Sequence, residues 1–184
     1  MNTFTEPRDL VGNPNYHRDR EEALSVLDPK ALDAPIADLV TGFAALPHCF
    51  TLQCCHGHFI WALGQDDHNI ERIPAGHSGP VTYRIAYLAI CLEDSARGRE
   101  LWDALSQAPR IDPGYIQFGS ADWFWERWPN SYVLQVEPAL HRFEDRAVLD
   151  CAEARHTERA RDAFFREIGA LLAREIRNAR PVVV

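Results

Sequence analysis

The pattern of hydrophobic and polar positions predicts helices at both ends of the chain. Residues 1–18 are polar and contain two prolines, so we expect an irregular N-terminal arm. A short helical pattern follows at Arg20–Leu27. The next helix is predicted by apolar residues at helical spacing, and Asp33, two residues before Pro35, is expected to cap it. Its apolar face comprises Ile36, Leu39, Val40, Phe43 and Leu46.

Runs rich in aromatic and β-branched residues predict about five strands. The longest, at 81–92, is almost continuously apolar in its second half, so both of its faces are expected to be buried. Residues 64–80 are polar and predict a long loop. The other four strands are expected at 49–53, 59–63, 115–118 and 132–136.

A second helical region closes the chain. Ala160, Phe164, Ile168, Leu171 and Ile176 form an apolar stripe in an amphipathic helix predicted over residues 157–180. A further helix, capped by Asp94 or Ser95, is expected to end before Pro109. We therefore predict a single α+β domain (α/β-like) over residues 1–184, with a mixed sheet of about five strands flanked by helices.

Composition excludes several function classes. The chain has 184 residues and a single lysine, Lys30, which follows no glycine run, so P-loop phosphate binding is excluded. The net charge of −8 argues against general nucleic-acid binding. The longest apolar run, 85–92, is too short to span a membrane, and five cysteines form no regular framework. A cytoplasmic protein with reduced thiols is expected.

The turn Cys54-Cys55-His56-Gly57-His58 carries the densest candidate chemistry. In an extended chain Cys54, His56 and His58 point to one face and Cys55 to the other. One hypothesis is a zinc site built from Cys54 or Cys55 with His56 and His58, since zinc accepts sulfur and nitrogen ligands. A fourth ligand would come from the next loop, from His68, His77 or an Asp.

The same turn supports two other interpretations. Cys55 can act as a nucleophile with His56, His58 or His77 as its base, because a neighbouring imidazole lowers the pKa of a thiol. Alternatively, the cysteines are buried at a strand end and the histidines cap the turn. The spacing does not decide among these roles.

An aromatic run, Trp123-Phe124-Trp125, is the second notable feature. In a strand, Trp123 and Trp125 share one face. That face either packs in the core or forms a wall for a planar ligand, with Arg127 beside it.

The stretch Leu27–Phe59 resembles the N-terminal region of the wybutosine-synthesis tRNA methyltransferase family. In that family a helix precedes Leu-Pro, an aromatic-Thr strand and a Ser-Ser-Cys-Ser-Gly-Arg turn. The corresponding residues here are Leu46-Pro47, Phe50-Thr51 and Gln53-Cys-Cys-His-Gly-His58. Cys55 matches the family cysteine, Gly57 the family glycine, and His77 a later histidine.

The resemblance implies a transferase that uses S-adenosylmethionine on a planar, nucleotide-like small molecule, with its site at the 54–58 turn. Cys55, His56 and His77 would be catalytic. Gly57, Trp123, Trp125 and Arg127 would contact the cofactor. The alternatives are a zinc-binding protein or metal-dependent hydrolase using Cys54, His56 and His58, and a non-catalytic protein that forms a homodimer through its C-terminal helix.

Overall fold

The computed structural model describes residues 5–179 and contains two antiparallel sheets. The four-stranded sheet has the order β1-β4-β6-β5, and the three-stranded sheet has the order β2-β3-β7. The first comprises β1 (Cys49–Cys55), β4 (Ala86–Leu92), β6 (Ser131–Val136) and β5 (Ile116–Ser120). The second comprises β2 (His58–Ile60), β3 (Val81–Arg84) and β7 (Arg146–Leu149).

The α+β class is confirmed, with a different strand arrangement from the one predicted. Every strand pairing within residues 5–179 is antiparallel, so the expected mixed sheet is replaced by two antiparallel ones. The predicted strand at 81–92 is interrupted at Ile85, where the chain passes from one sheet to the other. The short strand β7, which pairs with β3, was not predicted because it has only four residues and one of its two exposed positions is Val148, so its sequence does not alternate between apolar and polar residues.

Strand β4 is buried on both faces, as its apolar sequence predicts. Leu88, Ile90 and Leu92 belong to the main core, whereas Ala89 and Cys91 belong to two smaller clusters. This alternation follows from the two-residue period of a strand. The main core therefore lies on one face of the four-stranded sheet, and a second, thinner apolar layer lies on the other.

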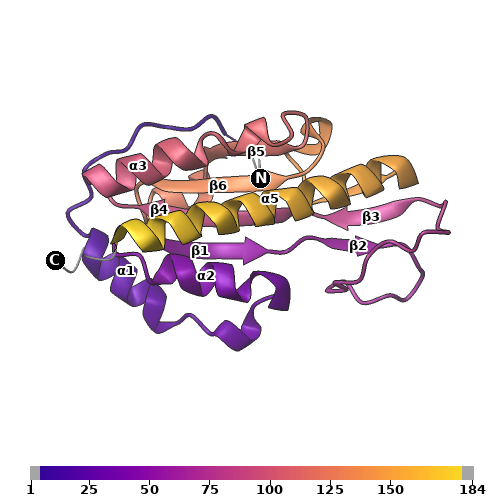
Figure 1. The fold of residues 1–184 in the computed structure, drawn as a ribbon, viewed down its shortest axis with the longest axis horizontal. Helices are drawn as coiled ribbons and strands as arrows, with labels where there is room; N and C mark the ends of the chain where they lie inside the picture. Colours follow the sequence, from indigo (N-terminus) through magenta and orange to yellow (C-terminus); the bar gives the residue numbers. More distant parts are fainter. Residues whose placement is uncertain (1–4, 180–184) are drawn as a thin grey trace.

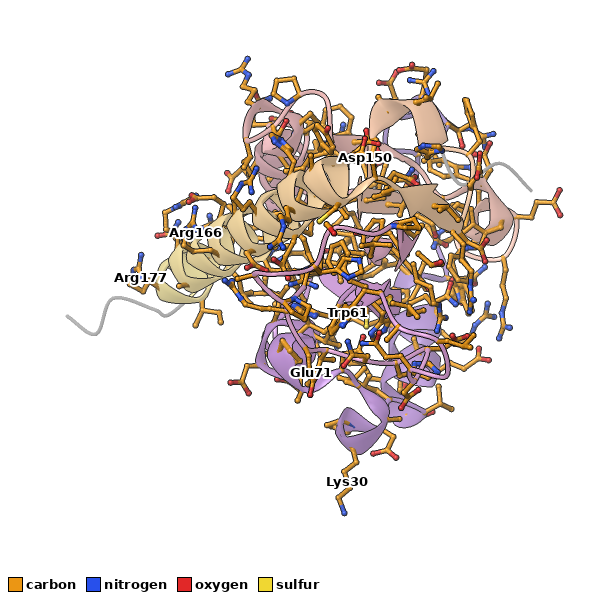
Figure 2. All side chains as sticks on the ribbon, turned by 90° about the vertical axis from the view of Figure 1, so that its right-hand side faces the viewer. Lys30, Trp61, Glu71, Asp150, Arg166 and Arg177 are labelled. Carbon is orange, nitrogen blue, oxygen red and sulfur yellow. The ribbon has the colours of Figure 1, made fainter. Side chains whose placement is uncertain are left out.

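Helix α5 (Cys151–Ala179) runs along both sheets, and α2 (Ala37–Ala44) and α3 (Ala96–Leu105) lie beside it (Figure 1). It begins six residues before the predicted start, and Arg180 lies outside the described residues. The apolar stripe packs in the main core: Ile176 is half-buried, and the other members, including Phe164 and Ile168, are buried. Arg166 and Arg177 project outward from the helix (Figure 2). The residues expected to drive self-association are thus used inside the fold, while dimer formation itself stays a prediction.

The first helix, α1 (Tyr16–Ser25), begins inside the segment predicted to be irregular. Tyr16 is buried and its ring lies 5.6 Å from that of Phe50, so it packs like a helical core residue despite its polar neighbours. Arg20 donates hydrogen bonds to the carbonyls of Ala44 and Leu46, which ties α1 to the end of α2. The irregular arm is confirmed only for residues 5–15, and residues 1–4 lie outside the described part.

The aromatic run forms a short helix, α4 (Asp122–Trp125), rather than a strand. The amide of Phe124 donates to the carbonyl of Ala121, and that of Trp128 to the carbonyl of Phe124. Because helical residues fan out, Trp123 and Trp125 do not share a face. Trp125 packs against Tyr132 and the main core, whereas Trp123 packs in the cluster on the opposite face.

The remaining helical segments among the described residues are four single 3₁₀ turns. They are η1 (Pro29–Ala31), η2 (Ala34–Ile36), η3 (Ala108–Arg110) and η4 (Ala139–His141).

Among residues 5–179, no helix has the combination of length and apolar character that membrane crossing requires.

Glu137, at the end of β6, is buried with one carboxyl oxygen lacking a hydrogen-bond partner. Its other oxygen accepts from Gln135. Burial, with a smaller contribution from the carboxylates of Glu144 and Asp145, raises the pKa of Glu137 to about 9. The folded protein therefore keeps this carboxyl protonated at neutral pH, whereas the unfolded chain ionises near its ordinary value of 4.5.

We expect Glu137→Gln to stabilise the protein at pH 8 but not at pH 4. As pH rises from 4.5 towards 9, the unfolded state of the wild type loses a proton that the folded state retains, so its free energy of unfolding falls. The variant lacks this loss, and the difference at pH 8 should be on the order of 5 kcal/mol. Urea unfolding at both pH values measures it. A difference independent of pH would contradict the assignment.

Candidate functional site

The site lies where two neighbouring strand segments pass from one sheet to the other. Cys55 pairs with Tyr87 at the end of the first sheet, and His58 pairs with Arg84 at the start of the second. Between these pairs the chain makes no regular ladder. Backbone groups there need other partners, because buried polar groups without hydrogen bonds are costly.

Tertiary contacts supply those partners. The amide of Ala86 donates to the hydroxyl of Tyr83 at 2.9 Å, and that hydroxyl donates to the carbonyl of Val136 at 2.6 Å. The amide of Ile85 donates to the carbonyl of Asp145 at 3.1 Å. The interruption is therefore a hydrogen-bonded junction rather than a frayed strand.

Gly57 is the tightest point of this junction. Its φ is +86°, and a Cβ atom on it would lie 2.7 Å from the Cβ of Ala86. Its carbonyl accepts a hydrogen bond at 3.1 Å from the buried guanidinium of Arg161 on α5. Both the positive φ and the close approach require glycine.

The positive φ at Gly57 interrupts the alternation of side chains that the sequence predicts. Cys54 packs against the main core, and His56 stacks on Phe165 of α5 with 5.3 Å between ring centroids. Burial, assisted by Arg161, lowers the pKa of His56 to about 4. His58, after the bend, instead joins Cys55.

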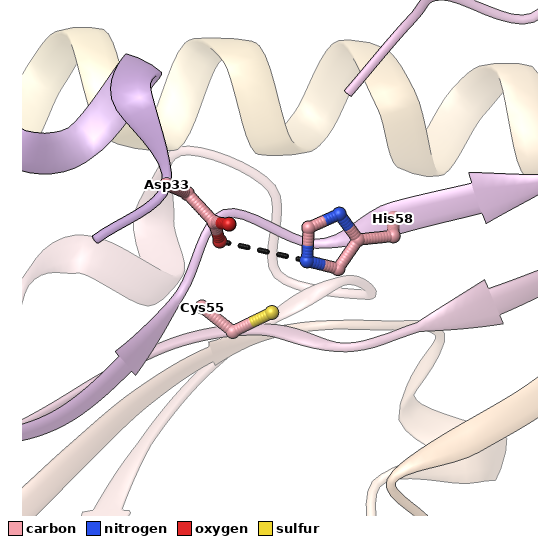
Figure 3. A group of neighbouring side chains, drawn as sticks. All are labelled: Asp33, Cys55 and His58. Atoms are coloured by element: carbon pink, nitrogen blue, oxygen red, sulfur yellow. Dashed lines mark ion pairs between the residues drawn. The ribbon is translucent and has the colours of Figure 1, made fainter. Parts of the chain in front are cut away.

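Asp33, Cys55 and His58 converge on one point (Figure 3). The donor atoms of the three side chains all lie within 4.8 Å of one another, and His58 Nε2 is 3.5 Å from Asp33 Oδ2. The same Asp33 oxygen accepts the His56 amide at 2.7 Å. Within the described residues this is the one group of three or more Cys, His, Asp or Glu side chains close enough to hold a metal ion.

The carboxylate and imidazole stabilise each other's charge. The hydrogen bond with Asp33, followed by that with Cys55, raises the pKa of His58 to about 10. The hydrogen bond with His58 lowers the pKa of Asp33 to about 2. His58 is fully buried and Asp33 is largely so. At neutral pH the pair is thus an ion pair beside the Cys55 thiol.

The cluster opens into a cleft formed by two adjoining cavities. The smaller, of about 350 Å³, is lined by all three residues and by Cys54 and His68. The larger, of about 610 Å³, is lined partly by Trp123, Val133 and Arg146. Both cavities are bordered by Gln53, Ile85, Tyr87 and Asp145.

Three other residues with predicted site roles lie outside this cleft. The carbonyl of His77 accepts hydrogen bonds from Cys151 and Arg155 at the start of α5, and His77 lines neither cavity. Trp125 is partly buried against the main core, and the guanidinium of Arg8 is 5.0 Å from its ring centroid. Arg127 forms an exposed ion pair with Glu22.

Of the predicted cofactor contacts, Trp123 alone lines the cleft. Gly57 shapes the junction through its backbone. Of the predicted zinc ligands, His58 is in the cluster, whereas His56 stacks on α5. Cys54 packs against the main core and borders the smaller cavity without joining the cluster. The nucleophile candidate Cys55 lies beside His58 and not beside His77.

Sequence reasoning missed Asp33 and Tyr87. Asp33 is at the N-cap position of η2, as predicted, but its side chain makes no capping hydrogen bond and turns to the cluster. An Asp before Ala-Pro gives an ordinary capping signal, so nothing local marks it as a site residue. Tyr87 belongs to the predicted strand, but its position beside the cleft depends on the pairing with Cys55.

Comparison with known proteins supports the fold and leaves activity open. No protein-family model and no curated protein matches the chain. Among solved structures, the PH1069 protein from Pyrococcus horikoshii matches with a TM-score of 0.50 and 14% identity. The match covers 86% of this chain and 93% of that one. At this identity the likeness concerns the fold alone.

A pair of glycine variants tests the junction. Gly64 also has a positive φ, +76°, but its substituent would meet no atom within 4 Å. We expect Gly64→Ala to cost about 1 kcal/mol, from backbone strain alone. Gly57→Ala should cost at least about 2 kcal/mol more, since its Cβ also collides with Ala86. Urea unfolding of both variants measures the difference, and equal losses would refute the packing argument.

Proposed function

We propose that the protein is an enzyme that binds a planar, nucleotide-like small molecule in the cleft and transfers a methyl group from S-adenosylmethionine. One observation carries the proposal. Cys55, the residue that the family resemblance singles out, lies with Asp33 and His58 at one end of a cleft that extends to Tyr87 and Trp123. The volume of the larger cavity, about 610 Å³, is in the range of small-molecule sites.

The aromatic side chains provide the binding surface. Tyr87 and Trp123 pack against the same apolar cluster and border the larger cavity, so both can contact the face of a flat ring. Burial raises the pKa of Tyr87, which keeps its hydroxyl neutral. Gln53 adds an amide group that can pair with the edge of a heterocycle, and Gln135, whose amide hydrogens are donated to Glu137 and Arg142, adds a carbonyl oxygen.

When bound, S-adenosylmethionine supplies a sulfonium methyl group: a substrate heteroatom bonds to the methyl carbon, the carbon–sulfur bond breaks with its electron pair on sulfur, and the heteroatom releases a proton. Catalysis is then mainly the positioning of two reactants. Asp145, an exposed carboxylate bordering both cavities, is the group that would accept the proton. The Asp33–His58 ion pair orients the substrate end nearest Cys55.

Isothermal titration calorimetry with S-adenosylmethionine tests the cofactor directly. We expect saturable binding of one equivalent. Absence of heat and of any thermal stabilisation at millimolar cofactor would reject the proposal.

The location of the ligand is tested separately. We expect Trp123→Leu to weaken binding by about fivefold or more, because one aromatic stacking contact is worth roughly 1 kcal/mol or more. Arg127→Ala is the matched control, since Arg127 is exposed and paired with Glu22 outside the cleft. Equal affinities for both variants would place the ligand elsewhere.

A further inference from the structure

We infer that Asp33, Cys55 and His58 form a binding site for zinc, with one coordination position open to the cleft. The three side chains offer one oxygen, one sulfur and one nitrogen donor, all of them groups that bind zinc in proteins. Three protein ligands and one open position are the arrangement of catalytic rather than structural zinc sites. The inference does not rest on the proposed methyl transfer, because it concerns the metal-binding residues alone.

The spacing of the donor atoms is close to that of a zinc site. His58 Nε2 and Asp33 Oδ2 are 3.5 Å apart, and two such ligands on a tetrahedral zinc ion are separated by roughly 3.3 Å. The Cys55 sulfur lies within 4.8 Å of both atoms, compared with roughly 3.6 Å in a tetrahedral site. The Cys55 sulfur is therefore the ligand atom that has to move closer, by at most about 1.2 Å.

The surrounding hydrogen bonds orient two of the ligands. His58 Nδ1 is 3.2 Å from the carbonyl oxygen of Asn69, and because a carbonyl can only accept, Nδ1 carries a proton. Nε2 therefore faces Asp33 and Cys55, and it becomes the ligating atom when the metal ion displaces its proton. The His56 amide holds the Asp33 carboxylate at 2.7 Å. Such outer contacts are characteristic of histidine and carboxylate ligands to metals.

The donor set also selects among metals. A thiolate and an imidazole favour zinc over magnesium or calcium, which prefer oxygen ligands. The bound ion would neutralise the negative charges of Asp33 and the Cys55 thiolate in a largely buried site. The open position faces the smaller cavity, where His68 also lies, with its ring centroid 5.4 Å from that of His58. A substrate oxygen or water molecule in the cleft can occupy that position.

Cobalt(II) provides the probe, because a cobalt–thiolate bond gives a charge-transfer absorption band in the near ultraviolet. Full-length protein without a polyhistidine tag is first stripped with a chelator and then titrated with cobalt(II). We expect the band to saturate at one equivalent and to disappear when zinc is added. No thiolate band at one equivalent would overturn the inference.

Neighbouring residues in the turn supply matched controls. We expect Cys55→Ser to abolish the thiolate band and Cys54→Ser to retain it. Likewise, His58→Gln should weaken cobalt binding by about 100-fold or more, while His56→Gln should leave it nearly unchanged. The inference is overturned if Cys54→Ser and His56→Gln are the variants that lose the metal, because the ligands would then be those of an unbroken extended strand.

Two further measurements keep the result interpretable. Circular dichroism and urea unfolding of each stripped variant establish that it is folded, and Asp33→Asn provides a third ligand variant should Cys55→Ser fail to fold. Binding of S-adenosylmethionine to stripped and zinc-loaded protein is measured independently. A protein that binds cofactor without cobalt disproves the metal site alone, and one that binds cobalt without cofactor disproves the methyl-transfer proposal alone.

Discussion

The close approach of Gly57 to Ala86 is the contact on which the rest of the structure depends. Two adjacent chain segments leave one sheet and enter another side by side, and they can do so only where one of them has no side chain. The lost ladder hydrogen bonds are replaced by the Tyr83 hydroxyl and the Asp145 carbonyl. These hydrogen bonds fix the backbone at Ile85 and Ala86, and Ile85 lines both cavities of the cleft.

The long C-terminal helix holds this junction from the opposite side. Arg161 is buried, donates to the carbonyl of Gly57 and lies 5.0 Å from the ring centroid of Phe59. Phe165 stacks on His56 one turn later. The helix therefore contacts Gly57 and His56 on one side of the turn, while Cys55 and His58 join Asp33 on the other. A single helix contributes to both the core and the rigidity of the site.

Periodicity and composition were sufficient to predict the class of fold and the positions of most elements. The apolar stripe of α5 and the two buried faces of β4 follow directly from their sequences. The site was harder to predict, because it depends on one dihedral angle and one long-range contact. An extended chain groups His58 with Cys54 and His56; the positive φ at Gly57 groups it with Cys55. Asp33 lies 22 residues before Cys55 in the sequence, and only the tertiary structure brings the two side chains together.

The irregularity in β1 determines which of two adjacent cysteines joins Asp33 and His58. Thr51 pairs with Ile90 and Gln53 with Ala89, so Leu52 is an extra residue in the strand. Without it, the inward and outward positions that follow would be exchanged, so Cys54 would point towards Asp33 and His58 and Cys55 towards the main core. The length of β1 is thus under tighter constraint than its composition. A single-residue deletion or insertion there would bring the neighbouring thiol to the place of Cys55, whereas most substitutions on the exposed side of the strand would leave Cys55 in place.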